Sequence, residues 1–70
     1  MTARIGQAGL GYWGTNLARN FDELSELVWL CEEREDRRRE AEPRYPGTRF
    51  TASFADVLSD PDVNAVVIAT

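Results

Sequence analysis

The sequence predicts an α/β fold, in which helices cover both faces of a parallel sheet of about four strands. Two observations favour it. Short apolar runs, typical of parallel strands buried on both faces, alternate with stretches of helical periodicity. The first of these runs also leads directly into Gly9, Gly11 and Gly14. Their spacing is typical of a tight turn that joins a strand to a helix.

Residues 3–8 are expected to form the first strand, with Gln7 as its one polar member. A buried amide needs hydrogen-bond partners. Gln7 is therefore interpreted either as a satisfied structural amide or as a side chain that points toward the sheet edge or a ligand crevice. Residues 12–21 are expected to form the first helix, because apolar residues recur there on the helical face that carries Gly14. They are Trp13, Leu17, Ala18 and Phe21.

Residues 22–26 are expected to form a polar connection, and residues 27–31 are expected to form the second strand. Cys31 is interpreted as a small buried apolar residue, since the chain contains no His that could activate it as a nucleophile. Residues 34–42 favour a helix that has little apolar surface to place against the sheet. We therefore expect this helix to be poorly anchored and to end at Pro43.

The last part of the chain predicts short elements. A turn at residues 45–47 leads into a third strand at residues 48–51. Ser53 and Asp56 then have the spacing of a capping box, which indicates a short helix through Leu58. Residues 60–62 predict a proline-centred turn rather than a pair of catalytic carboxylates. Residues 63–69 contain a second buried parallel strand.

Each glycine of the motif has a mechanical role in this order of elements. Gly9 permits the tight turn, Gly11 lets a pyrophosphate approach the backbone, and Gly14 lets the helix lie close to the strand. The first N–H groups of the helix would face the phosphates, and Glu32 would accept hydrogen bonds from a ribose. This predicts a dinucleotide-binding half of a partial Rossmann fold, with strand order 3-2-1-4. The alternatives are a glycine-rich turn without a ligand and a solvated carboxylate at Glu32.

Composition limits the other classes of function. The net charge of −4 disfavours nucleic acid and anionic membrane surfaces as partners. No apolar run is long enough to span a membrane, and the start of the sequence lacks a signal region. The single Cys31 cannot form an internal disulfide, and no Cys/His cluster suggests a metal site. We expect a cytoplasmic protein.

Residues 9–17, 20–21, 45–47 and 60–70 together resemble the Gfo/Idh/MocA oxidoreductases. The resemblance covers nearly the whole chain. It implies that residues 1–70 form the amino-terminal part of a NAD(P)-binding Rossmann domain, and that the rest of that domain and a substrate domain lie outside this chain. Gln7, Arg38 or its neighbours, and Pro43 depart from the family pattern.

The resemblance also implies an activity for the parent protein: NAD(P)-dependent oxidation of a hydroxyl on a sugar, cyclitol or sugar nucleotide. The family's catalytic lysine would lie outside this chain, which contains no lysine, so no catalytic residue is assigned here. Whether the 70 residues alone act as an enzyme stays open. The alternatives are a non-enzymatic NAD(H)-sensing or nucleotide-binding regulatory domain and a methyltransferase, which the spacing of Gly14 disfavours. The parent protein is expected to be a homo-oligomer.

NAD is favoured over NADP, because the Glu32 carboxylate would repel a 2′-phosphate. Arg34 and Arg37 lie near the same loop and oppose this preference. We also expect the fourth strand to form a sheet edge, so that the isolated 70 residues would be marginally stable or self-associating. The expected cofactor-binding residues are Gly9, Leu10, Gly11, Tyr12, Trp13, Gly14, Glu32, Arg37, Ala69 and Thr70.

Overall fold

The computed structural model describes residues 3–69 of the chain. Its four strands are all parallel and lie in the order β3-β2-β1-β4, so the predicted fold and strand order are confirmed. The elements along the chain are β1 (Arg4–Ala8), α1 (Tyr12–Leu24), β2 (Glu26–Cys31), α2 (Glu35–Ala41), the 3-10 turn η1 (Glu42–Arg44), β3 (Arg49–Thr51), α3 (Phe54–Leu58) and β4 (Ala65–Ile68).

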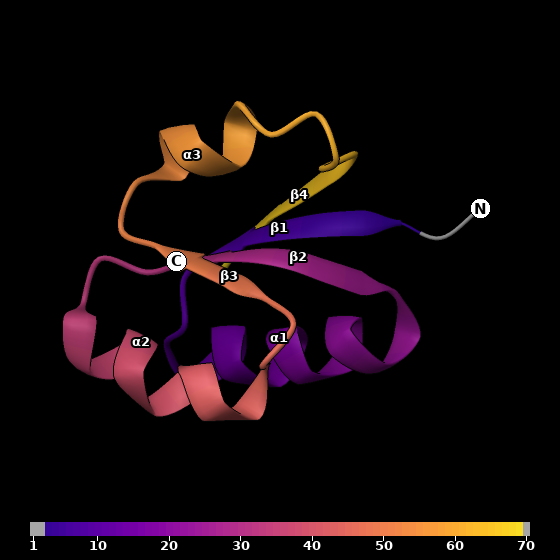
Figure 1. Cartoon of the computed structure of the whole chain (residues 1–70). Helices are drawn as coiled ribbons and strands as arrows, with labels where there is room; N and C mark the ends of the chain where they lie inside the picture. Colours follow the sequence, from indigo (N-terminus) through magenta and orange to yellow (C-terminus); the bar gives the residue numbers. More distant parts are fainter. Residues whose placement is uncertain (1–2, 70) are drawn as a thin grey trace.

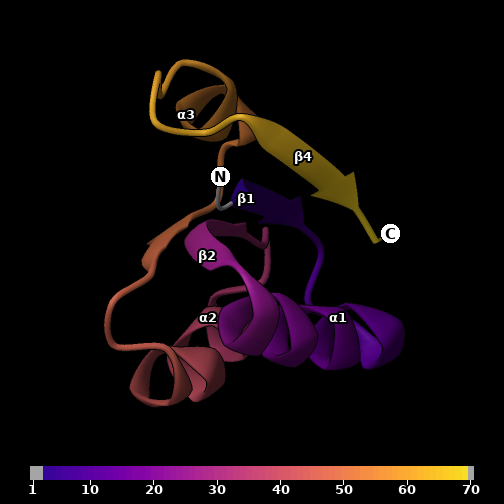
Figure 2. The same cartoon turned by 90° about the vertical axis from the view of Figure 1, so that its right-hand side faces the viewer.

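Helices cover both faces of the sheet. Figures 1 and 2 show α1 and α2 on one face and α3 on the other. On the α3 face, Val57 is fully buried and packs so closely on β1 that a Cβ at Gly6 would collide with Val57 Cγ1. The main apolar cluster joins β1 and β2 to α1. It contains Ile5, Leu10, Ala18, Leu27, Leu30 and Tyr45.

The first helix is longer than the sequence predicted. Residues 22–24 were expected to be part of a polar connection, but they form the last turn of α1. Asp22 and Glu23 are exposed there, so their polarity reflects the solvent face of a helix rather than a loop. The helix ends at Ser25, whose N–H and hydroxyl both donate to the Phe21 carbonyl.

No helix of the described residues is long and apolar enough to cross a membrane.

The second helix is weakly attached to the sheet, as predicted. No residue of α2 is buried. A charged side chain replaces apolar packing: Arg38 Nη1 donates to the carbonyl oxygens of Glu32 at 2.6 Å and Glu33 at 3.1 Å. The α-helix ends at Ala41, and Pro43 lies in the 3-10 turn that follows.

Two local predictions were wrong. The capping box does not form, because Ser53 makes no side-chain cap and Asp56 instead accepts a hydrogen bond from Thr51 Oγ1. The fourth strand is not buried on both faces: Val66 and Ile68 are 45% and 68% exposed. This strand pairs with β1 alone, so it forms the sheet edge that the strand order predicted.

Candidate functional site

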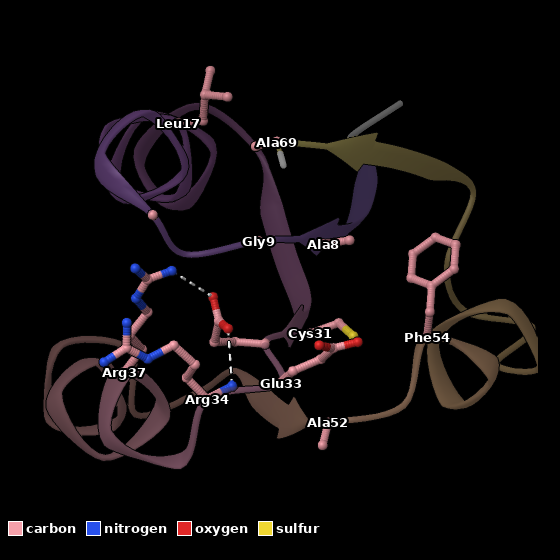
Figure 3. A pocket seen from close by; sticks show the side chains of 12 residues that line it. Ala8, Gly9, Leu17, Cys31, Glu33, Arg34, Arg37, Ala52, Phe54 and Ala69 are labelled. Carbon is pink, nitrogen blue, oxygen red and sulfur yellow. Dashed lines mark hydrogen bonds and ion pairs between the residues drawn. The ribbon is translucent and has the colours of Figure 1, made fainter.

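The carboxyl ends of the four strands meet at a pocket of about 740 Å³ (Figure 3). Two backbone hydrogen bonds of 2.8 Å join the ends of adjacent strands. Gly9 N donates to Cys31 O, and Ala69 N donates to Ala8 O. Between β1 and β4 the order of the sheet reverses, and open α/β sheets bind ligands at such a switch point. The pocket is lined by Ala8, Gly9, Gly11, Leu17, Cys31, Glu32, Glu33, Arg34, Arg37, Ala52, Phe54 and Ala69.

Two glycines of the turn are required by the protein itself. Gly9 has a φ of 103°, in the left-handed region that side-chain-bearing residues rarely adopt. Gly14 lies against the same turn, where a Cβ would collide with the Gly9 carbonyl oxygen and lie 2.9 Å from its carbon. The start of α1 is therefore packed directly on the turn that leaves β1.

Gly11 differs from both. It caps α1 with φ of −70° and ψ of −166°, an extended conformation open to any residue. A Cβ there would meet Arg37 Nη1 at 3.7 Å, an ordinary contact. Neither the backbone nor the packing of the described residues requires glycine at this position. A ligand that must approach the backbone supplies a reason for it.

The open backbone groups beside Gly11 suit an anion. Helical bonding in α1 begins with Thr15 N donating to Gly11 O at 2.9 Å. The N–H groups before Thr15 have no partners within the helix and carry partial positive charge. The first turn of α1 contains no acidic side chain to occupy them. This geometry can bind a phosphate group.

Glu32 connects the end of β2 to the glycine turn. Its side chain is only 8% exposed and accepts hydrogen bonds from the backbone N–H groups of Leu10 at 2.8 Å and Arg34 at 2.9 Å. Burial opposes ionisation, but these two N–H groups and the Arg37 guanidinium together hold the pKa of Glu32 below its ordinary value. The residue is therefore a carboxylate at neutral pH.

The two arginines of the pocket have different partners. Arg34 forms a two-bond ion pair with Asp36, with N···O distances of 3.2 and 2.7 Å. Arg37 Nη1 lies 3.7 Å from Glu32 Oε1 and reaches over the glycine turn. Of the two, Arg37 is thus the cation coupled to the Glu32 carboxylate.

Cys31 lines the pocket but is 6% exposed. Burial and the carboxylates of Glu32 and Glu33 raise the pKa of its thiol. A thiol with a raised pKa is a poor nucleophile at neutral pH. The structure is thus in keeping with the interpretation of Cys31 as a small apolar residue.

The structure brings together half of the predicted site residues: Gly9, Gly11, Glu32, Arg37 and Ala69 line the pocket. Leu10 lies in the core and reaches the site through its backbone N–H. Gly14 lies behind the turn. Thr70 and the side chains of Tyr12 and Trp13 lie outside the described residues.

Seven of the twelve lining residues were not among the predicted cofactor-binding residues, and Leu17, Ala52 and Phe54 are three of them. Ala52 and Phe54 follow β3, and Figure 3 shows Phe54 across the pocket from Leu17 of α1. The predicted order 3-2-1-4 places the end of the third strand beside that of the second, so the topology could have indicated Ala52 and Phe54. Leu17 was assigned to the core face of its helix, and nothing in its periodicity distinguishes core from pocket.

Comparisons with known proteins place the fold among dehydrogenases. A probable dehydrogenase from Thermotoga maritima matches with 33% identity and a TM-score of 0.86 over 96% of this chain. GenD2 from gentamicin A biosynthesis, solved in complex with NAD, matches with 25% identity and a TM-score of 0.87 over 99% of the chain.

A third structure shows the same fold. Scyllo-inositol dehydrogenase from Lactobacillus casei, with bound NAD(H) and scyllo-inositol, has 23% identity and a TM-score of 0.86 over 100% of the chain. No family model matches the sequence, and no curated protein matches it. The chain spans about a fifth of the length of these neighbours, covering 20% of the first two and 22% of the third.

Proposed function

The structural neighbours of this chain are Gfo/Idh/MocA-type dehydrogenases, and on that premise we propose that it forms the dinucleotide-binding part of an NAD(P)-dependent oxidoreductase. The observation that carries the proposal is Gly11. Its conformation and surroundings would accept a side chain, whereas Gly9 and Gly14 could not. A pyrophosphate lying against the backbone at the start of α1 accounts for this difference.

Each part of the cofactor has a candidate partner in the pocket. The pyrophosphate would bind the N–H groups at the start of α1, next to Gly11. The Glu32 carboxylate has spare acceptor capacity for ribose hydroxyls beyond its two backbone bonds. The bound dinucleotide would supply the hydride acceptor, and the residues of this chain would bind and orient it.

We propose NAD as the preferred cofactor. A 2′-phosphate beside the buried Glu32 carboxylate would place two anions together. Arg37 reduces that repulsion, since it lies 3.7 Å from the same carboxylate. The neighbours support NAD, although one with 25% identity over 99% of the chain is named a putative NADPH-dependent oxidoreductase.

For the whole protein we propose oxidation of a hydroxyl on a sugar, cyclitol or sugar nucleotide. Support comes from the neighbours, of which one is an inositol dehydrogenase and another is named for gentamicin A biosynthesis. In such a reaction NAD would supply the acceptor for the hydride of the carbinol carbon, and the hydroxyl proton would pass to a base as the carbonyl forms. The chain itself contributes the cofactor site, and we assign none of its residues to the chemical step.

We also propose that residues 1–70 belong to a longer Rossmann domain in a cytoplasmic, homo-oligomeric protein. The share of the neighbours that this chain spans supports the first point. So does the edge strand β4, on which Val66 and Ile68 leave exposed apolar surface. A sharp two-state unfolding transition in urea from a monomeric 70-residue chain would contradict the proposal that these residues belong to a longer domain.

The test is a calorimetric titration of the full-length protein with NADH, with S-adenosylmethionine as the competing ligand, followed by assays for NAD reduction with a panel of cyclitols and sugars. We expect micromolar NADH binding, no binding of S-adenosylmethionine, and turnover of at least one polyol. NADH binding without turnover would favour the alternative, an NAD(H)-sensing regulatory domain. Absence of NADH binding would overturn the proposal.

A further inference from the structure

Gln7 is a buried amide that touches both sides of the glycine turn. It lies on β1, and its side chain is fully buried. Its Nε2 donates to the Gly9 carbonyl at 3.0 Å and to the Gly14 carbonyl at 2.7 Å. One amide group thus joins the point where the chain leaves β1 to the first turn of α1.

This amide is a costly choice for the core. Gln7 Oε1 is buried and has no hydrogen-bond partner among the described residues. A buried acceptor without a partner destabilises a fold, and this cost offsets part of what the two hydrogen bonds from Nε2 contribute. Glutamine therefore stabilises the fold by less than its two hydrogen bonds alone would suggest.

The two carbonyl groups that accept hydrogen bonds from Gln7, those of Gly9 and Gly14, flank the segment that would bind phosphate. Gly9 holds a left-handed backbone conformation, and Gly14 is packed against its carbonyl group. Gly11 and the first N–H groups of α1 lie between them in the chain. Two hydrogen bonds from one rigid amide plane restrict how far the two carbonyl groups can move relative to each other.

We propose that Gln7 is a positioning residue, which holds the glycine turn in the geometry that binds the cofactor's pyrophosphate. The inference rests on the proposed function, because it concerns affinity for the dinucleotide. Gln7 itself lines no part of the pocket. Gln7 would affect cofactor binding indirectly. It holds the turn in its binding geometry in advance, which lowers the free-energy cost of ordering the turn on binding.

The test compares Gln7→Met with the wild type in the full-length protein. We expect the Kd for NADH to rise about tenfold, which corresponds to about 1.4 kcal/mol. The urea midpoint should fall by no more than in the control variant below, because removal of the unpaired Oε1 offsets part of the loss of the two hydrogen bonds. Amide hydrogen exchange in residues 9–15 should become faster, while exchange in β2 stays unchanged.

Thr48→Val is the matched control. It removes a hydroxyl that donates to the Leu27 carbonyl at 2.8 Å, and Thr48 lies outside the pocket. This variant should lower the urea midpoint and leave the Kd for NADH unchanged. Loss of affinity in both variants in proportion to their loss of stability would overturn the positioning role.

Two further outcomes would also overturn the inference. One is a Gln7→Met protein with unchanged affinity and unchanged exchange at residues 9–15. The other is failure of both Gln7→Met and Gln7→Leu to fold, which would make Gln7 a structural residue. A wild-type protein that does not bind NADH would instead overturn the proposed function, and the exchange measurement would still report whether Gln7 restrains the turn.

Discussion

The carboxylate of Glu32 accepts a hydrogen bond from the Leu10 backbone N–H at 2.8 Å, so the end of β2 holds the glycine turn that follows β1. Its second oxygen accepts the Arg34 N–H at 2.9 Å and thereby holds the start of the next loop as well. Glu32 was predicted as a ribose ligand alone. In the structure the same side chain also connects the two loops that border the pocket.

Glu32→Gln should lower stability and weaken its dependence on pH. The amide has one acceptor oxygen for two N–H groups, so the free energy of unfolding should fall by about 1 to 3 kcal/mol at pH 7. The pKa of Glu32 is lowered by folding, so its contribution is complete above the ordinary value of 4.5 and is lost as the pH falls through the folded pKa. Urea denaturation between pH 3 and 7 measures both effects.

The wild type should therefore lose more stability than Glu32→Gln as the pH drops below about 4.5. Asp60 titrates in both proteins, since the Asp62 N–H and the Trp29 indole lower its pKa as well. The pH dependence of stability that remains in Glu32→Gln therefore reports Asp60 and other carboxylates whose pKa is lowered by folding. Parallel pH profiles for the two proteins would show that Glu32 is not the carboxylate responsible.

Cofactor preference should respond in opposite directions to changes at Glu32 and Arg37. Glu32→Ala removes the anion that opposes a 2′-phosphate and should reduce the preference for NAD by about ten- to a hundredfold, or about 1 to 3 kcal/mol. Arg37→Ala leaves that carboxylate without its cation at 3.7 Å and should increase the preference. The measurement is kcat/KM for both cofactors in the full-length enzyme. Equal values, or an NADP preference, in the unmutated protein would refute the assignment of Glu32.

Arg38→Ala should loosen α2 without unfolding the sheet. Arg38 is the side chain that ties this helix to the carbonyls of Glu32 and Glu33, and α2 buries no residue of its own. Amide exchange in residues 35–41 should accelerate, with a loss of about 1 kcal/mol in global stability. Arg39→Ala is the control, because its ion pair with Glu35 is exposed and worth at most about 0.5 kcal/mol. Equal exchange rates in the two variants would argue against an anchoring role for Arg38.

Gly6→Ala should destabilise the contact between β1 and α3. The added methyl group would collide with Val57 Cγ1, and relief of such overpacking costs about 1 to 3 kcal/mol. Gly47→Ala provides the comparison, since its Cβ would meet nothing within 4 Å. That variant should be neutral or more stable by up to about 1 kcal/mol. Urea midpoints of the two variants decide the matter, and equal midpoints would contradict the packing of α3 on Gly6.

The features that the sequence predicted are those encoded in local pattern. Gly9 and Gly14 have the turn and packing roles that their spacing indicated, and the apolar runs became parallel strands in the predicted order. The features that it missed depend on contacts between distant segments. Gly6 is required by Val57, which lies about fifty residues further along the chain.

Side-chain hydrogen bonding was the other source of error. Local spacing assigned the α3 cap to Ser53 and Asp56, but a hydroxyl on β3, that of Thr51, bonds to Asp56 instead. In the same way, the low apolar content of α2 predicted weak attachment but not the bonds that Arg38 supplies. Residue type and spacing do not determine which of several polar partners lies within reach in three dimensions.

The most direct test of the cofactor site is calorimetric titration with NADH of three full-length proteins: the wild type, Gly11→Ala and Gly14→Ala. Gly14→Ala should be destabilised, because its Cβ would collide with the Gly9 carbonyl. Gly11→Ala should stay within about 1 kcal/mol of wild-type stability and yet bind NADH at least tenfold more weakly, since its methyl group would occupy the space of the pyrophosphate. A folded Gly11→Ala protein that binds NADH as tightly as the wild type would contradict the account.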